Sequence, residues 1–403
     1  MSNTNLTHDW ILNEAQRIAH EKATFLGSIN RQFDSSYGNS GSKIGNTLRV
    51  RMPNQYTRTQ GTRVIDVQDS EDTKVDLVMA TQDHVAMRFN SAELLLDKDE
   101  FSKRHIEPAM AALISGIESD VLQGCTKLTY NVAGTAGSAI TTLDVPGKAR
   151  AKLNQQLAPK DMNRAIQMDS VTMGGLVNGM AAYFNPSGAI SDQYKEGLIA
   201  RTAMADYYEN ERVWTLTNGS DVSTVTLDTY TVVDSDSTIT ITGAAGVAEG
   251  AVFTIAGVYD CHPETKAAYS HLKQFTVLSG SSDTALIISP TIYLTGAKKN
   301  VASATGGTAA PSTTAAIVFV GAASAAYVQP LMYHKEAFAF VTGDLPMMGD
   351  SIRCARKTVD GISMRVWTAS DIRNDEQITR IDMLYGYAAI RPQWACRMIG
   401  AAN

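Results

Sequence analysis

The chain has 403 residues, of which 44% are hydrophobic and 19% charged, and its 35 basic and 41 acidic side chains give a net charge of −6. This length and hydrophobic content predict two or three folded units and exclude a largely disordered chain. The acidic balance argues against a protein that wraps DNA electrostatically, because such a protein needs a large surplus of Lys and Arg.

The cysteines and the apolar segments bear on the compartment. Four cysteines, at positions 125, 261, 354 and 396, show no CxxC spacing, which favours free thiols in a reducing cytosol. Residues 1–10 lack a basic segment followed by an apolar one, so we expect no signal peptide. The uncharged stretch 300–333 has an apolar part, 315–328, that is shorter than the ~20 residues of a spanning helix, so we expect no membrane segment.

The N-terminal segment predicts a helical arm. Apolar side chains in residues 7–26 recur at three- and four-residue steps, and Thr7 and Asp9 offer capping oxygens at the start. A loop rich in Gly, Ser and Asn follows at residues 28–46. This order predicts an arm tethered to a folded body.

Residues 46–82 predict a long two-stranded hairpin in which charge is distributed unevenly. Segments 47–52 and 75–79 alternate polar and apolar residues, as antiparallel strands do. The outgoing side is basic and the turn and return are mostly acidic: the first holds Lys43, Arg49, Arg51, Arg58 and Arg63, the second Asp66, Asp69, Glu71, Asp72 and Asp76. An isolated ribbon is only marginally stable in water, so docking onto another surface would explain it. A solvated hairpin, whose charges only maintain solubility, explains the pattern equally well.

A long amphipathic helix is predicted over residues 99–127. Its apolar positions, from Phe101 to Cys125, form one broad stripe, and its acidic start and basic end suit the helix dipole. Pro108 falls inside this helix and should kink it or separate its first turns.

The middle of the chain predicts a mixed domain interrupted by an all-β insertion. Helices are expected at 148–157 and 171–184, with a strand at 164–168 between them. Residues 215–320, called here the inserted module, contain no Arg, four Lys and eight acidic residues, and hence carry −4 of the net charge. Alternating Thr- and Val-rich segments predict strands in this module at 223–227, 238–242, 252–255, 275–278 and 286–288. After the module, alternation at 362–367 and 379–387 predicts two further strands.

No constellation of residues predicts catalysis. The chain has no P-loop, no G-x-G-x-x-G after a strand, no H-E-x-x-H and no G-x-S-x-G motif. Cys261, His262, Glu264 and His271 resemble a metal cluster in type but not in zinc-like spacing, and a loop of the β module explains them better. His334 has no orienting partner in the sequence, which favours a structural role. We therefore expect no catalytic residue, no cofactor and no metal.

In their order, the arm, hairpin, long helix and inserted module resemble the major capsid proteins of tailed bacteriophages, and most closely the group typified by the coat protein of phage P22. The resemblance is carried by residues 106–110 (IEPAM), 250–259 (GAVFTIAGVY) with 274–277 (QFTV), 333–340 (YHKEAFAF) and 381–392 (IDMLYGYAAIRP). It spans nearly the whole chain, and the ordered set is more specific than any one stretch.

The resemblance implies an α+β architecture, the HK97-like capsid fold, with an inserted β-barrel domain. The expected parts are the N-terminal arm (1–45), the extended E-loop hairpin (46–82), the spine helix with the first part of the peripheral domain (83–145), the first part of the axial domain (146–214), the inserted barrel (215–320), the second part of the axial domain (321–350), and the peripheral sheet with the C-terminus (351–403).

The resemblance also implies a function. Proteins of this kind self-assemble as hexamers and pentamers into the icosahedral shell around double-stranded DNA, by way of a scaffolded procapsid that expands on maturation. The implied partners are further copies of the chain, a scaffolding protein, a portal protein, weakly and non-specifically contacted DNA and, as a further candidate, a decoration protein. Assembly is expected in the cytoplasm of the bacterial host, and the product is the virion capsid.

Site residues follow from the same comparison. Subunit contacts are expected from the E-loop residues Arg49, Arg51, Arg58, Arg63, Asp69, Glu71 and Asp72, because a basic edge can face a neighbour's acidic surface head to tail. Contacts are also expected from Trp10, Ile11, Ile18 and Phe25 of the arm, and hinges at Pro108, Gly41 and Gly45. Two other classes stay open: a β-rich adhesin, tail or decoration component, and a cytosolic enzyme with a deep polar cleft.

Overall fold

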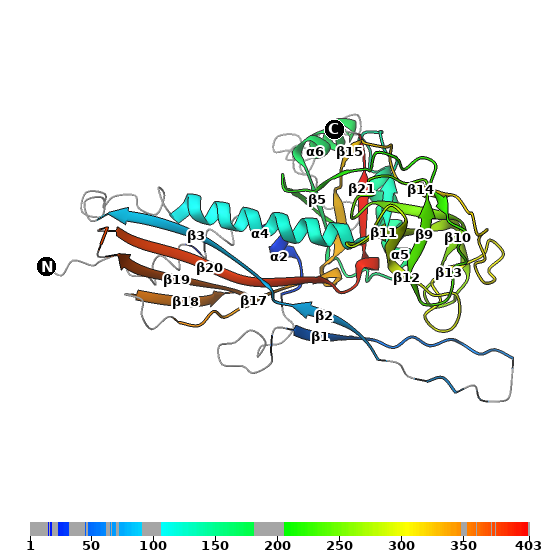
Figure 1. The fold of residues 1–403 in the computed structure, drawn as a ribbon, viewed down its shortest axis with the longest axis horizontal. Helices are drawn as coiled ribbons and strands as arrows, with labels where there is room; N and C mark the ends of the chain where they lie inside the picture. The colour runs from blue at the N-terminus through cyan, green and yellow to red at the C-terminus, as the bar shows by residue number, and fades with distance from the viewer. Residues whose placement is uncertain are drawn as a thin grey trace, which may run out of the picture. The chain divides into compact units, whose positions relative to one another are not determined.

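The computed structural model describes residues 15, 17, 23–31, 45, 47–61, 65, 67–69, 72–90, 106–180, 205–347, 353–359, 361–371, 373–374 and 376–401. The chain divides into two compact units (Figure 1). The first comprises Met1–Val50, Lys74–Val121 and Phe338–Ile390, and the second comprises Arg51–Thr73, Leu122–Ala337 and Arg391–Asn403. Neither unit is a continuous segment, because the chain passes between them several times.

The first unit is built on an antiparallel sheet whose long central strand is β20 (Glu376–Ala389). Its other strands are β3 (Thr81–Asn90), β17 (Phe338–Gly343), β18 (Arg353–Val359) and β19 (Ile362–Asp371) (Figure 1). Strand β3 pairs with one edge of β20, and β19 and β17 pair in turn with the other. The expected strands at 362–367 and 379–387 are confirmed, and their apolar positions Val366, Ile381 and Met383 are fully buried.

Helix α4 (Glu107–Leu128) confirms the predicted long helix, of which residues 99–105 lie outside the described residues. Its 22 residues extend roughly 33 Å at 1.5 Å per residue. Pro108 is the second residue of α4 as the structure describes it, and residues 101–105 before it lie outside the described residues, so the expected kink stays a prediction. The short helix α2 (Phe25–Ser28) and the paired strands β1 (Thr47–Met52) and β2 (Thr73–Val78) complete the N-terminal part.

The second unit contains a five-stranded mixed sheet, called here the axial sheet. Its order is β4 (Val132–Gly134), β21 (Ala395–Ile399), β16 (Leu331–His334), β5 (Arg164–Met168) and β6 (Asp206–Glu209). Helices α5 (Asp144–Gln155) and α6 (Ser170–Met180) confirm the two predicted helices, and β5 confirms the predicted strand. Leu153, Ile166 and Met398 belong to the core between these elements. None of the helices that the structure describes is long and apolar enough to cross a membrane.

The inserted module folds as a β-barrel. Its strands are β8 (Thr226–Leu227), β9 (Asp236–Thr242), β10 (Val252–Cys261), β11 (Ala268–Val277), β12 (Ala285–Ile292), β13 (Val301–Ala302) and β14 (Ile317–Phe319). Strands β8 to β12 each overlap one of the five predicted strands, which are thereby confirmed. The sheet runs from β14 through β10, β11, β12 and β9 to β8. It closes because Leu227 donates to the carbonyl of Ala315 (3.0 Å) and Ile317 donates to that of Val225 (2.8 Å). Strands β7 (Thr215–Thr217) and β15 (Ala326–Val328) pair where the chain enters and leaves the module.

Two expected domain boundaries need correction. Residues 321–350 were assigned to the axial domain, but β17 within that range pairs with β20 in the first unit. Residues 351–403 were assigned to the peripheral domain, but β21 pairs with β4 and β16 in the axial sheet. Both errors have one cause: local alternation identifies a strand without identifying the sheet that it joins.

Candidate assembly surfaces and the docking face of the inserted module

The ribbon, residues 47–78, presents most of its predicted interface residues to solvent. Arg49, Arg51, Arg58, Asp69 and Asp72 are all exposed, whereas Arg63 and Glu71 lie outside the described residues. The two halves of the ribbon also contact each other. Arg49 and Asp76 form a loose ion pair of 3.9 Å, in which 69% and 45% of the two side chains are exposed. Such a pair is well solvated and leaves both charges accessible to a partner.

In the described middle of the ribbon, the side chain of Gln68 joins the two halves. The Gln68 amide accepts a hydrogen bond from the backbone N–H of Thr57 (2.8 Å) and donates one to the Thr57 carbonyl. Beside this contact, Tyr56, Ile65 and Val67 expose 58%, 85% and 82% of their surface. Apolar side chains this exposed on a narrow ribbon are typical of a surface that a partner covers.

The described part of the arm is fixed to its own chain. The backbone N–H of Phe25 and the hydroxyl of Thr24 both donate to the Glu118 carboxylate of α4, at 3.0 and 2.9 Å. The ring of Phe25 is buried and lies 6.2 Å from that of Phe338. Phe25 therefore makes an intramolecular contact, and its expected role between subunits stays a prediction. Trp10, Ile11 and Ile18 lie outside the described residues.

Of the three expected hinge residues, the structure describes two. Gly45 has φ of +81°, a conformation that non-glycine residues rarely adopt, and no atom approaches its Cβ position within 4 Å. Pro108 lies in the first turn of α4, and Gly41 lies outside the described residues. The positive φ of Gly45 is compatible with a hinge, and the hinge itself stays a prediction.

The residues that suggested chemistry have structural roles. His334 is buried: its Nε2 lies 2.9 Å from Asp161, and its Nδ1 accepts from the backbone N–H of Glu336. Partial desolvation opposes ionisation of Asp161, but hydrogen bonds from Asn163 and His334 outweigh it and lower the pKa of Asp161 to about 2. The sequence did not predict this partner, because Asp161 and His334 are brought together only by the pairing of β5 with β16.

The residues between β10 and β11 form a hydrogen-bonded turn. His262 Nδ1 accepts hydrogen bonds from the backbone N–H groups of Glu264 and Thr265, at 3.1 and 3.2 Å. The thiol of Cys261 donates to the carbonyl of Lys299. Among the residues that the structure describes, no three His, Cys, Asp or Glu side chains are grouped as a metal would need.

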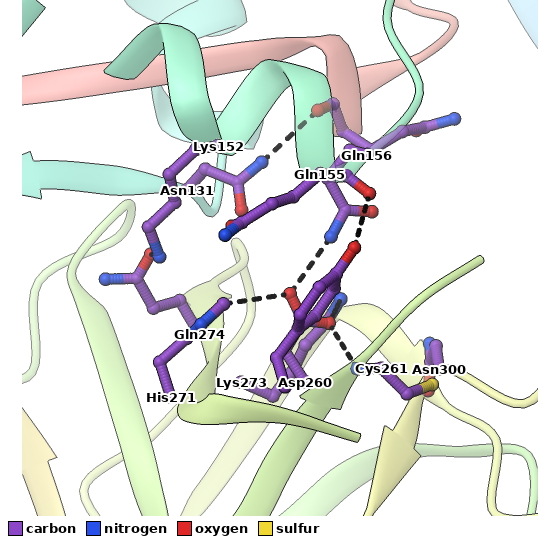
Figure 2. A network of polar contacts seen from close by, with 12 residues as sticks. Asn131, Lys152, Gln155, Gln156, Asp260, Cys261, His271, Lys273, Gln274 and Asn300 are labelled. Carbon is purple, nitrogen blue, oxygen red and sulfur yellow. Dashed lines mark hydrogen bonds and ion pairs between the residues drawn. The ribbon is translucent and has the colours of Figure 1, made fainter. Parts of the chain in front are cut away.

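A buried polar network, which the sequence did not predict, connects the inserted module to the axial sheet and α5 (Figure 2). We call this surface the docking face; on the module side it consists of Asp260, Tyr269, Lys273, Gln274 and Thr276. Lys273 and Asp260 form an ion pair of 2.8 Å, with only 4% and 6% of the side chains exposed. Gln156, at the end of α5, donates to the other oxygen of Asp260 at 3.0 Å. The phenol of Tyr269 donates to the carbonyl of Gln155 at 3.2 Å.

Burial and charge act against each other in this pair. Desolvation alone would raise the pKa of Asp260, but the attraction and hydrogen bond of Lys273, together with His271 at 3.5 Å, outweigh it and lower the pKa to about 2. Desolvation likewise disfavours the charged Lys273, yet Asp260 holds the pKa of Lys273 above its usual range. Both groups are therefore charged at neutral pH, and each depends on the other.

The other two residues of the docking face, Gln274 and Thr276, bond mainly to backbone groups outside the module. The Gln274 side chain accepts from the backbone N–H of Val132 (2.9 Å) and from Lys152 Nζ (2.8 Å), and donates to the Val132 carbonyl (3.2 Å). The hydroxyl of Thr276 donates to the carbonyl of Lys127 at 2.9 Å. These bonds make the docking face specific in orientation, because polar contacts are satisfied in one geometry only.

Comparison with known proteins identifies the family. A family model described as "P22 coat protein - gene protein 5" matches residues 42–400. No curated protein matches the chain. Similar solved structures include "Mycobacterium phage Che8" (TM-score 0.49, 12% identity, 93% of this chain and 90% of that chain) and "Capsid of Ralstonia phage GP4" (0.48, 7%, 93% and 87%). A third is "Capsid structure of the Cyanophage P-SCSP1u" (0.45, 10%, 94% and 93%).

The match begins in the ribbon region and ends after β21, so it includes the long helix, both sheets and the inserted barrel. Because this one model covers most of the chain, the protein belongs to the P22 coat protein family, and is a phage major capsid protein, a structural subunit of the virion shell.

Proposed function

We propose that copies of this chain join through the ribbon into the hexamers and pentamers of an icosahedral shell. The observation that carries this proposal is the exposure of the ribbon. Its basic side chains Arg49, Arg51 and Arg58 and its apolar side chains Ile65 and Val67 are exposed on a two-stranded element. A ribbon of this kind gains stability when a neighbouring copy covers it.

The energetics suit an assembly that must correct its errors. A single exposed ion pair contributes only about 0.2–1 kcal/mol, so no single ribbon contact holds a shell together. Many such contacts, repeated in every subunit, add up to a stable shell while each remains reversible during growth. The net charge of −6 also suits a container that must not bind its packaged DNA tightly.

The remaining parts of the assembly pathway belong to the same proposal. A scaffolding protein would direct a rounded procapsid in the host cytoplasm, a portal protein would replace one pentamer, and packaging of double-stranded DNA would trigger expansion. Gly45 and the preceding loop with Gly41 are the proposed hinges for the arm, together with Pro108 at the start of the helix. The N-terminal arm (1–45), the E-loop hairpin (46–82), which includes the ribbon, and the inserted barrel (215–320) are proposed as domains with these boundaries. We propose no catalytic activity, no metal and no cofactor.

Reversal of charge on the ribbon tests the proposal. The triple variant Arg49→Glu, Arg51→Glu and Arg58→Glu should remain a folded monomer by circular dichroism and sedimentation, yet form no shells in negative-stain micrographs. A matched control reverses three exposed charges outside the ribbon: Lys160→Glu, Lys335→Glu and Arg373→Glu. Shells of normal size and yield from the ribbon variant would remove the ribbon from assembly.

A further inference from the structure

The inserted module has a hydrophobic core of its own. Every buried residue of this core lies between Val222 and Phe319, with Phe253, Phe275 and Leu286 fully buried. The axial sheet has a separate core that includes Ile166, Met332 and Met398. The barrel therefore buries most of its apolar side chains in a core that contains no residue of the axial sheet.

Attachment of the module to the axial sheet relies mainly on polar contacts. Val132, Val252, Tyr327 and Ile399 form one small apolar cluster at this boundary. The remaining contacts are those of the docking face, in which side chains of the module bond to backbone groups and side chains of the axial part (Figure 2). Such contacts define position well but each contributes little stability.

Strand β21 is an interior strand of the axial sheet, the second in its order, although it comes after every other described strand in the chain. It pairs with β4 on one side and with β16 on the other, and all five of its residues are buried. Its backbone also bonds outside these pairs: Met398 donates to the carbonyl of Pro330 at 2.7 Å. Without β21, the described axial sheet would lose its second strand and β4 would be detached from β16.

The side chain of Arg397 extends from β21 to the inserted module. Its guanidinium is fully buried and donates to the carbonyl of Gly250 (2.6 Å), the hydroxyl of Thr276 (3.0 Å) and the carbonyl of Lys127 (2.9 Å). Within the described part of the chain, these acceptors are carbonyl and hydroxyl oxygens and not carboxylates. The group also lies over the ring of Trp214, 5.8 Å from its centroid.

This arrangement joins three segments that are far apart in the sequence. Lys127 is in the last turn of α4, where backbone carbonyls have no partner inside the helix and carry partial negative charge. Gly250 and Thr276 belong to the inserted module. Burial lowers the pKa of Arg397 to about 9, so the guanidinium remains a cation at neutral pH. The two Nη groups of this buried cation bond to the three acceptors, whereas its buried Nε has no partner among the described residues. Because a buried charge is costly without partners, the placement of Arg397 depends on these three acceptors.

We propose that Arg397 is the positioning residue that docks the inserted module onto the axial sheet, so that docking is completed only when strand β21 has been incorporated. The barrel folds on its own core first, and the C-terminal strand then fixes its orientation. Chains that end before β21 would carry a folded but undocked module. If the proposed assembly through the ribbon also holds, such chains would be excluded from shells.

Two backbone amides distinguish docking from folding. The N–H of Val132 donates to the side chain of Gln274 and so reports docking, whereas the N–H of Leu278 donates to the carbonyl of Ile287 inside the barrel and so reports its folding. Hydrogen exchange of both amides is measured by mass spectrometry on the unassembled full-length chain, so the result does not depend on shell formation. The variants are Arg397→Met, Arg397→Lys and the control Cys396→Ala, whose side chain belongs to the axial core.

In Arg397→Met we expect exchange at Val132 to become faster by on the order of tenfold or more, with Leu278 unchanged. Arg397→Lys keeps the charge but cannot reach three acceptors, so it should fall between the wild type and Arg397→Met. Cys396→Ala should leave both amides protected. Unchanged protection of Val132 in Arg397→Met would overturn the proposal. Loss of protection at both amides would also overturn it, because the barrel would then depend on Arg397 for folding and not only for docking.

Discussion

The buried ion pair of the docking face allows a sharp prediction about stability and its dependence on pH. In the variant Lys273→Met, Asp260 loses the ion pair with Lys273 (2.8 Å) and keeps hydrogen bonds from Gln156 and the backbone N–H of Cys261, both at 3.0 Å. The imidazole of His271 also stays 3.5 Å from the carboxylate. Removing one partner from a buried pair costs about 3–5 kcal/mol. The two remaining hydrogen bonds place the expected loss at the lower end, about 3 kcal/mol at pH 7.

The sign of the pH dependence should reverse. In the wild type the pKa of Asp260 is about 2 in the folded chain, below its ordinary value, so Asp260 contributes stability above pH ~4 that is lost as pH falls from ~4 towards 2. Without Lys273, desolvation dominates and raises the pKa of Asp260 above its unfolded value. The variant should therefore gain stability as pH falls from 7 towards 4, a range in which this group has no effect on the wild type.

Urea unfolding of the unassembled chain at pH 7 and pH 5, followed by tryptophan fluorescence, measures both effects. The control is Lys148→Met, which removes an exposed ion pair of 2.6 Å with Asp144 and should cost less than about 0.5 kcal/mol at either pH. A loss below about 1 kcal/mol in Lys273→Met, with no change in pH dependence, would show that the pair is solvated and that the reasoning is wrong.

Two further predictions concern the first unit. Gly386→Ala would place a Cβ atom 2.1 Å from the carbonyl oxygen of Val78, so the two backbones must separate. We expect thermal unfolding to show a loss of roughly 2–3 kcal/mol in the free energy of unfolding. The control Gly174→Ala, at an open helical position, should change this free energy by about 1 kcal/mol or less. Glu118→Ala removes the acceptor for the Phe25 N–H and should release the arm, which limited proteolysis would detect as faster cleavage within residues 23–31. An unchanged cleavage rate would show that the other contacts of the arm, among them the backbone bonds of Asn30 with Phe338 and Phe340, hold it without Glu118.

Much of the architecture was predictable because its signals are local. The apolar stripe of α4 repeats with the period of a helix, and the alternation in β9, β19 and β20 repeats with the period of a strand. The inserted module was also visible, since its change of composition and its turn residues lie within one continuous segment. Periodicity records which face of an element is buried, and this information is contained in neighbouring residues.

The docking face could not be predicted, because it depends on contacts between residues far apart in the chain. Gln274 and Val132 are 142 positions apart, and Arg397 and Lys127 are 270 apart. The neighbours of Arg397 in β21 are all apolar, which is typical of a strand buried on both faces, but they do not identify the acceptors of its guanidinium. The partner of His334 was missed for the same reason.

The sequence by itself determined the helices, most of the strands and the inserted all-β module, because each follows from the spacing of polar and apolar residues over short distances. Only the tertiary structure decided that β17 belongs to the sheet of the first unit and β21 to the axial sheet, and that Asp260, Lys273 and Arg397 are buried. The physical reason is that backbone hydrogen bonds in a sheet do not depend on the side chains of a particular partner. The choice of sheet, and the burial of charge that accompanies it, therefore arise from the packing of the whole chain.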